Sequence, residues 1–441
     1  MLGTDELVPT LSGRRVRYVN LDNAATAPAM RAAVAAVEEA LPYYGSVHRG
    51  AGHHARRSTE AYEAARCEIG RFLGADARQD TVLFTKNTTE AINKLARSMP
   101  IAEGTVVVTT ELEHHSNDLP WRPRAATIHA GVLDDGSLDL DDLDGILARH
   151  AGRVALLVVS GASNVTGVVP PIHDLAERVH DAGGRIVVDA AQLAPHRAID
   201  MGAHDDPGHL DFVALSAHKL YAPYGSGALV GRRDAFGPVP DQTGGGTVHA
   251  VTLDDVAWAD LPDREEAGTP NLLGAVAFAA ATRRLTEIGF ERVAIHERAV
   301  LARLVAGLRG IDGVTLYGPR DRTATIGVVP FTVAGLHHGL VAAVLGYEHG
   351  IAVRSGCFCA HPYVARLLGL HRRDADHWLQ HARDGDKRDA PGMVRASLGL
   401  HNIDEDVDRL VEAVSRIAAG DIAGEYGGDD HGDYRPLRGA A

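Results

Sequence analysis

The sequence predicts an α/β protein with a mostly parallel sheet of seven strands between helices and a smaller α+β part. Between residues 81 and 231, short β-branched runs alternate with helix-length amphipathic stretches, a pattern typical of parallel strands buried on both faces. After residue 274 the pattern changes to longer helical tracts. We therefore expect a large domain over 20–273 and a small domain formed by 1–19 and 274–419.

The elements of the large domain follow one another in alternation. Strands are expected at 81–85, 106–110, 126–130, 153–160, 185–190, 211–215 and 227–231. Helices are expected at 29–41, 58–73, 89–97, 140–149 and 172–182. In the second of these helices, Tyr62, Ala65 and Ile69 recur at helical spacing, and Ser58 is the predicted N-cap.

The small domain contains fewer predicted elements. We expect a long helix, two strands and two further helices, at 285–308, 314–317, 324–332, 340–345 and 404–417. Two segments are predicted to stand apart from the core. Residues 372–389 are crowded with charge and are expected to form a solvated insertion, and residues 420–441, rich in Gly and Asp, are expected to form a flexible tail.

Composition excludes several classes of function. The formal net charge of −14 argues against a general nucleic-acid binder, because affinity for phosphate depends on clustered Lys and Arg. The apolar stretches end well before the ~20 residues that a membrane span requires. Residues 1–17 lack the apolar region of a secretory signal. We therefore expect a cytoplasmic protein with neither nucleic acid nor membrane as a partner.

One lysine follows the strand expected over 211–215. Only four of the 44 basic residues are lysines, and Lys219 ends the segment Ser216-Ala-His-Lys219. In open α/β sheets ligands collect beyond the carboxyl ends of strands, so this amine could form a Schiff base with a bound aldehyde. A surface salt bridge is the plain alternative for any lone lysine.

A carboxylate ends the preceding apolar strand. Asp189 could keep a pyridine nitrogen protonated, which makes the ring an electron sink, and Gln192 could donate to a ring hydroxyl. An Asp at such a position is otherwise a helix cap or a turn residue. Asp189 therefore supports a cofactor site mainly because it ends the strand that comes before the strand leading to Lys219.

Thr88 and Thr89 stand where a strand runs into a helix. The free N–H groups and hydroxyls of a helix N-terminus can bind a phosphate, although a plain N-cap would explain the same residues. Ser216, His218 and Thr269 are further candidate donors to the same phosphate.

His114 follows the strand expected over 106–110. An imidazole there could stack on an aromatic cofactor or transfer protons. The paired histidines at 114–115 and 53–54 and the Cys-x-Cys at 357–359 also raise the question of zinc. Neither His pair has the i, i+4 spacing of a zinc protease and no second Cys pair exists, so we assign no metal site.

Nine segments carry a resemblance to a known family. In order they are Leu21-Asp-Asn-Ala-Ala25, Val47-His-Arg-Gly50, Asn87-Thr-Thr-Glu-Ala-Ile-Asn93, Glu113-His-His-Ser-Asn117, Ser163-Asn-Val-Thr-Gly167, Val188-Asp-Ala-Ala-Gln192, Ser216-Ala-His-Lys219, Ala267-Gly-Thr-Pro-Asn271 and Arg354-Ser-Gly-Cys-Phe-Cys-Ala360. From about Asn20 to Ala418 the chain resembles the class V aminotransferases and, more closely, the Suf-type cysteine desulfurases, which overlap with selenocysteine lyases. The resemblance implies fold type I of the transferases that depend on pyridoxal 5'-phosphate (PLP), with PLP as cofactor.

The resemblance also implies roles for the residues that contact the cofactor. Lys219 matches the Schiff-base lysine, Asp189 the partner of the pyridine nitrogen, Gln192 the donor to the ring hydroxyl and His114 the histidine that stacks over the ring. The residues that match phosphate ligands are Thr89, Ser216, His218 and Thr269. The family supplies the last of these across a dimer interface, which implies a homodimer.

Three further residues match groups near the substrate. Asn164 falls where an Asn meets substrate or cofactor, and Arg354 and Arg395 match groups beside the substrate. Arg395 is the better candidate for the substrate carboxylate, for which a guanidinium is geometrically suited.

Cysteine separates a desulfurase from a transaminase. Cys359, in the loop over 354–362, matches the family's nucleophile, whose thiolate attacks the substrate sulfur, keeps it as a persulfide and leaves alanine. A buried, inert cysteine is the alternative, and it fits Cys67, in a predicted helix, better. Cys357 departs from the family pattern, in which a His or another polar residue is common; it could trap the persulfide or merely line the loop.

The sequence thus predicts a cysteine desulfurase that passes sulfur from L-cysteine to an acceptor protein, for iron–sulfur cluster assembly, cofactor thiolation or a biosynthetic pathway. One alternative is a selenocysteine lyase, or a carbon–sulfur lyase, transaminase or epimerase with a specialised substrate. Another is a non-catalytic scaffold or metal-binding module. The insertion over 372–389 could shield the persulfide, dock the acceptor or reflect a different substrate.

Overall fold

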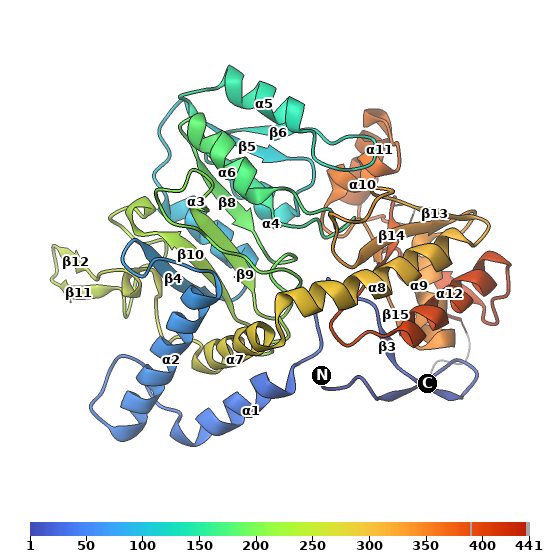
Figure 1. Ribbon diagram of the computed structural model, residues 1–441, viewed down its shortest axis with the longest axis horizontal. Coiled ribbons are helices and arrows are strands. Elements are labelled where there is room, and N and C mark those ends of the chain that lie inside the picture. Colours follow the sequence, from blue (N-terminus) through green and yellow to red (C-terminus); the bar gives the residue numbers. More distant parts are fainter. Residues whose placement is uncertain (389, 438–441) are drawn as a thin grey trace.

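The computed structural model describes residues 1–388 and 390–437. Its larger part is built on one seven-stranded sheet (Figure 1). The strands are β4 (Asp80–Thr85), β5 (Val106–Thr110), β6 (Ala126–Ala130), β7 (Val154–Ser160), β8 (Arg185–Asp189), β9 (Phe212–Ser216) and β10 (Gly227–Arg232). Their order is β4-β10-β9-β8-β7-β5-β6; β10 is antiparallel to both of its neighbours, and the other neighbouring pairs are parallel. The predicted fold class and its seven strands are confirmed.

Helices cover both faces of this sheet, which explains why its strands are apolar without alternation. Val107, Leu156 and Val187 pack in one core with the helix α3 (Thr88–Ser98). Val108 and Leu157 pack on the other face with α5 (Leu140–Arg149), α6 (Ile172–Asp181) and α7 (Leu272–Ile288). The helices of this larger part are α1 (Arg31–Ala40), α2 (His53–Phe72), α3 (Thr88–Ser98), α4 (His115–Asp118), α5 (Leu140–Arg149), α6 (Ile172–Asp181) and α7 (Leu272–Ile288). A two-stranded ribbon of β11 (Val248–Val251) and β12 (Val256–Trp258) extends from one side.

Helix α2 begins before its predicted start, so the prediction of Ser58 as an N-cap is wrong. Gly52 is the N-cap. Ser58 is buried inside the helix, where its hydroxyl donates to the carbonyl of Tyr43 and accepts from the N–H of Gly45. The hydroxyl thus fixes the preceding loop rather than the end of the helix.

The smaller part is a four-stranded antiparallel sheet with its own apolar core. Its strands, in spatial order, are β13 (Val314–Leu316), β14 (Val328–Val333), β17 (Met393–Ser397) and β16 (Arg354–Gly356). The core is shared with helices α8 (Phe290–Arg309), α9 (His338–His349) and α12 (Asp404–Ala418). The N-terminal segment joins this part: β1 (Leu7–Pro9) pairs with β2 (Arg15–Arg17), and β3 (Val19–Asn20) pairs with β15 (Ile351–Ala352).

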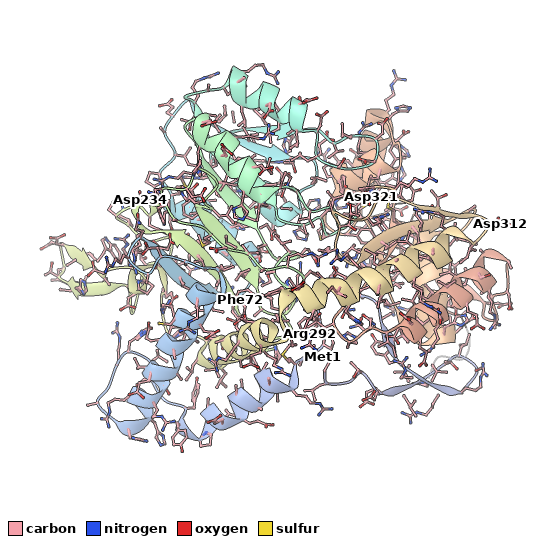
Figure 2. All side chains as sticks on the ribbon, viewed as in Figure 1. Met1, Phe72, Asp234, Arg292, Asp312 and Asp321 are labelled. Carbon is pink, nitrogen blue, oxygen red and sulfur yellow. The ribbon has the colours of Figure 1, made fainter. Side chains whose placement is uncertain are left out.

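The single helix predicted over 285–308 is wrong, because two helices meet there. Gly289 lies between α7 and α8 with φ = 87°, a conformation that glycine adopts without steric cost. Figure 2 labels Arg292 near the start of α8 and Asp312 just past its end, and shows the helix running from the large sheet to the far side of the small one.

Both segments predicted to stand apart carry regular structure. The insertion contains α11 (Arg372–Arg383), which follows α10 (His361–Leu367), and the ring of Trp378 stacks on that of His361 at 4.6 Å. The chain after residue 420, expected to be a flexible tail, forms a hairpin of β18 (Tyr426–Gly428) and β19 (Tyr434–Pro436) that packs on α9. Residues 389 and 438–441 of these segments lie outside the described residues.

Within the described ranges, none of the helices combines the length and the apolarity needed to cross a membrane.

Candidate active site

A cavity of about 450 Å³ lies where β7, β8 and β9 end, as expected for a parallel sheet. Ser160, Asp189 and Ser216, the last residues of these strands, line one side of it. The structure brings nearly all of the predicted site residues to this cavity, namely Thr88, Thr89, His114, Asn164, Asp189, Gln192, Ser216, His218, Lys219, Arg354, Cys359 and Arg395.

Asp189, at the end of β8, and Lys219, in the turn that follows β9, line the same cavity. Burial lowers the pKa of Lys219 to about 8, although the negative charge of Asp189 opposes this shift. Burial likewise raises the pKa of Asp189, against the effect of the lysine charge. The amine can therefore lose its proton near neutral pH, which a nucleophilic amine requires.

Gln192 lies beside this pair and is buried. Its side-chain amide donates to the carbonyl of Ala24 at 2.7 Å. That bond fixes the position of the side chain at the wall of the cavity.

His114 is the N-cap of the short helix α4. Its Nδ1 accepts a hydrogen bond from the N–H of Ser116 at 3.1 Å, which places the proton of the neutral ring on Nε2. Burial, reinforced by the charge of Lys219, lowers the pKa of His114 to about 3. The ring is therefore neutral at pH 7 and can donate from Nε2.

The start of α3 forms an anion cradle. The N–H of Thr88 donates to Ser216 Oγ, and that hydroxyl donates to Thr88 Oγ1, both at 2.9 Å. The hydroxyl of Thr89 lies 2.7 Å from that of Ser116. These hydroxyl groups and the positive end of the helix dipole favour an anion at this place.

His218 lines the same cradle. Burial, with the charge of Lys219, lowers the pKa of His218 to about 4, and its Nδ1 lies 3.0 Å from the hydroxyl of Thr26. The ring is therefore neutral at pH 7.

A loop from the small part closes the cavity and carries Cys359. Phe358 and Cys359 both adopt left-handed backbone conformations, with φ of 53° and 56°, which cost energy in residues other than glycine. Two hydrogen bonds hold them: the Asn164 amide donates to the Phe358 carbonyl at 2.7 Å, and the N–H of His115 donates to the Cys359 carbonyl at 2.8 Å. The exposed thiol of Cys359 thus stands at the cavity wall on a fixed backbone.

The other two cysteines are placed differently. Cys357 lines a separate cavity of about 310 Å³ together with Trp378 and Lys387 of the insertion. Its thiol donates to the carbonyl of Pro391 at 2.8 Å, and burial raises the pKa of Cys357 to about 12. Cys67 lies in α2 as expected, but it is exposed, so the prediction of its burial is wrong.

Two arginines on neighbouring strands share one carboxylate. Arg395 is buried, and its guanidinium donates to Asp22 at 3.1 Å and to the carbonyl of Asn164 at 2.9 Å. Its Nε has no hydrogen-bond partner in the described structure. Arg354 is half-exposed and lies 3.4 Å from the other oxygen of Asp22. Arg395 therefore keeps unused donors at the cavity, as a carboxylate site needs.

Sequence reasoning assigned no role to Asp22 or to Glu113, although both lie in the segments quoted above. Glu113 is fully buried and accepts hydrogen bonds from Thr110, Asn117 and Ser160. Burial raises its pKa to about 7 despite these bonds. Its neighbours Glu111 and His114 are polar as well, so the local sequence carries no signal that separates Glu113 from them.

Thr269 is the one predicted site residue that does not line this cavity. It is exposed, in the loop that precedes α7.

Comparisons with known proteins agree with the geometry. Residues 19–410 match the model of the family described as aminotransferase class-V. A probable cysteine desulfurase 2 of Mycobacterium leprae is 38% identical, with 84% of each chain covered, and a cysteine desulfurase of Haloferax volcanii is 36% identical, covering 90% of this chain and 88% of its own. The apo structure of a cysteine desulfurase from Thermococcus onnurineus NA1 superposes with a TM-score of 0.79 at 33% identity, over 91% of this chain and 95% of that one.

Proposed function

Because this chain belongs to the aminotransferase class-V family and its curated relatives at 33–38% identity include cysteine desulfurases, we propose that it removes sulfur from L-cysteine. It is a cysteine desulfurase, which leaves L-alanine and passes the sulfur on as a persulfide. The observation that carries this assignment is that Lys219, Asp189 and Cys359 line one cavity.

The residues around the cavity fit PLP as the cofactor. The anion cradle at the start of α3, with Ser216 and His218, suits its phosphate, and buried Asp189 suits its pyridine nitrogen. Lys219, with its lowered pKa, suits its aldehyde. When bound, PLP would act as an electron sink for the substrate carbanion.

The other cavity residues would bind and orient the substrate. The unused donors of Arg395 suit the substrate carboxylate, and the guanidinium is held in place by Asp22 and Asn164. The neutral ring of His114 can hold or give a proton at Nε2. Lys219, once free, can accept the substrate's α-proton.

Cys359 would receive the sulfur. Its thiolate attacks the sulfur of the substrate cysteine, a sulfur–sulfur bond forms, and the carbon–sulfur bond breaks. The electron pair of the broken bond stays with the carbon, which takes a proton and becomes the methyl group of alanine. The two bonds that hold the Cys359 backbone support this role, because they fix the nucleophile at the cavity wall.

We infer that the enzyme acts as a homodimer with a sulfur-acceptor protein. Thr269 is exposed and lies outside the cavity, which is consistent with a residue that binds the cofactor phosphate in the active site of a second copy. Cys359 is exposed, which is consistent with transfer of its sulfur to another protein. Three free cysteines suit a reducing compartment such as the cytoplasm.

The test is an assay of the purified protein with L-cysteine, L-selenocysteine and L-cysteine sulfinate, measuring alanine together with sulfide, selenide or sulfite. We expect alanine and sulfide from L-cysteine, and no borohydride-reducible adduct in Lys219→Ala. An adduct that survives in Lys219→Ala would refute the role of Lys219. Alanine released only from one of the other substrates would refute the assignment of cysteine.

A further inference from the structure

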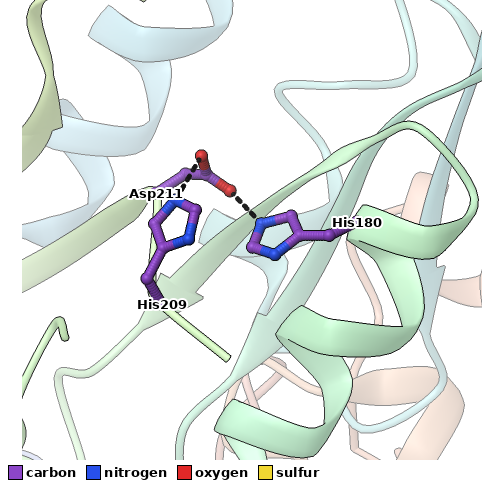
Figure 3. Close-up of side chains that lie close together, drawn as sticks. All are labelled: His180, His209 and Asp211. Carbon is purple, nitrogen blue, oxygen red and sulfur yellow. Dashed lines mark hydrogen bonds and ion pairs between the residues drawn. The ribbon is translucent and has the colours of Figure 1, made fainter. Parts of the chain in front are cut away.

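Three side chains meet at the edge of the large sheet opposite the active-site cavity. His180 lies near the end of α6, and His209 and Asp211 come just before β9, whose far end carries Ser216 (Figure 3). One nitrogen of each ring and one carboxylate oxygen all lie within 4.8 Å of one another. His209 and Asp211 are buried, with 7% and 1% of their surfaces exposed, and His180 is partly exposed.

The hydrogen bonds of the two rings fix where their protons are. Nδ1 of His180 lies 2.6 Å from the carbonyl oxygen of Pro207, and Nδ1 of His209 lies 2.9 Å from that of Asp206. A carbonyl oxygen can only accept, so each Nδ1 carries a proton. The remaining nitrogen of each ring, Nε2, then carries a lone pair when the ring is neutral.

Both of these Nε2 atoms face the same carboxylate. His180 Nε2 lies 2.8 Å from one oxygen of Asp211, and His209 Nε2 lies 3.3 Å from the other. The second contact does not form a hydrogen bond, and His209 Nε2 is buried without a hydrogen-bond partner in the described part of the chain. Neutral rings would therefore point two lone pairs at an ionised carboxylate, which is unfavourable in a buried place.

Protonation of both rings would remove this conflict only by placing two cations face to face. The rings are stacked with centroids 4.5 Å apart, and Arg232 already lies 3.8 Å from Asp211. Positive charges on both stacked rings would repel each other.

A metal ion would remove this conflict without any further proton. It would accept the lone pairs of both Nε2 atoms while each Nδ1 keeps its proton. Two imidazole nitrogens and a carboxylate oxygen form a donor set that zinc binds in proteins, with water at the fourth position. Zinc-bound histidines usually donate their other N–H to a backbone carbonyl or carboxylate, as both rings do here. The N–H of Ile186, at 2.9 Å from Asp211, also holds the carboxylate in place.

We propose that His180, His209 and Asp211 bind a divalent cation of the zinc type. The site joins the end of α6 to the start of β9 and lies apart from the residues assigned to sulfur transfer. His204 stacks on His209 at 5.3 Å and bonds to Asp80, so it supports the ring without being a ligand.

The test is zinc content. Purified full-length protein is treated with a chelator, incubated with zinc sulfate and desalted, and zinc per chain is measured by mass spectrometry. We expect about one zinc per chain, and a rise in Tm on zinc addition. His209→Asn and, at the partly exposed position, His180→Gln should lose both the zinc and the rise in Tm.

Two controls separate this site from others. His249→Asn removes an exposed histidine outside the cluster, and Cys359→Ser removes the thiol of the active site; both should keep the zinc. Zinc that is lost in Cys359→Ser but kept in His209→Asn and His180→Gln would overturn the proposal. So would a wild-type protein that retains no zinc at micromolar zinc concentration.

Discussion

The side-chain amide of Asn164 donates a hydrogen bond of 2.7 Å to the carbonyl oxygen of Phe358, across 194 positions of sequence. Phe358 precedes Cys359, and both residues hold left-handed backbone conformations. The bond therefore attaches the loop from the small sheet to the large part that carries Lys219.

We expect Asn164→Ala to lower the rate of alanine formation from L-cysteine about tenfold, which corresponds to ~1.4 kcal/mol of activation free energy. The reason is that the strained loop loses one of the two hydrogen bonds that hold its carbonyls. Alanine is measured at matched cofactor content. Asn93→Ala is the control, since the Asn93 amide bonds to a carbonyl of its own helix. Equal rates in wild type and Asn164→Ala would show that the tether does not position the thiol.

Cys359 and Cys357 should differ sharply when each is changed to serine. Cys359→Ser should lose at least about 100-fold of its alanine formation, because serine is a far weaker nucleophile toward sulfur. Cys357→Ser should stay within about threefold, because a thiol with a pKa of about 12 is protonated at neutral pH.

Alkylation followed by peptide mass spectrometry locates the persulfide. We expect the extra sulfur on Cys359, with exposed Cys67 alkylated as an internal control. Extra sulfur found first on Cys357 would contradict the assignment of the nucleophile.

Gly227 keeps the anion cradle open. A Cβ at this position would lie 2.6 Å from Cα of Asn87, the N-cap of α3, and 2.6 Å from the carbonyl oxygen of Leu215. We expect Gly227→Ala to weaken PLP binding at least about tenfold, since the start of α3 must move. Absorbance titration of cofactor-free protein measures this, and Gly245→Ala, where a Cβ meets open space, should bind normally.

Glu113 should make the protein less stable as pH rises. Its pKa is about 7 in the folded protein against an ordinary value of 4.5, so the folded state keeps a proton that the unfolded state releases. The free energy of unfolding should therefore fall by up to ~3 kcal/mol between pH 4.5 and 7.

Glu113→Gln should flatten this pH dependence, because the neutral amide stays uncharged across the range. The amide of Asn117, whose Oδ1 has no partner within the described residues, can rotate to accept from the new side chain. Urea unfolding at pH 5 and pH 7.5 measures the difference. An identical slope in the wild type and the variant would contradict the assignment.

Inner strands such as β7 and β8 could be predicted because each is a run of apolar residues that is almost entirely buried. The candidate residues at strand ends, such as Asp189 and Lys219, followed from the rule that parallel strands end at one edge. Local sequence did not indicate that Ser58 bonds to a preceding loop, or that Gly289 divides two helices with a positive φ.

The arrangement around Cys359 could not be predicted, because it depends on contacts between distant segments. The carbonyl of Phe358, a residue with a left-handed backbone, is held by Asn164, and Arg395 is oriented by Asp22. The cluster of His180 and His209 could not be predicted for the same reason. The orientation of each ring depends on a hydrogen bond from Nδ1 to a backbone carbonyl, and the spacing of residues in the sequence does not reveal such bonds.

Arg395 reaches back to Asp22 over nearly the whole length of the chain. All seven strands of the large sheet lie before residue 233, so a chain emerging from the ribosome can pair them early. The strand that carries Arg395 begins only at residue 393, long after the last strand of the large sheet has ended at residue 232. A chain that stops before residue 393 would thus carry the large sheet but not Arg395, and we expect it to release no alanine from L-cysteine.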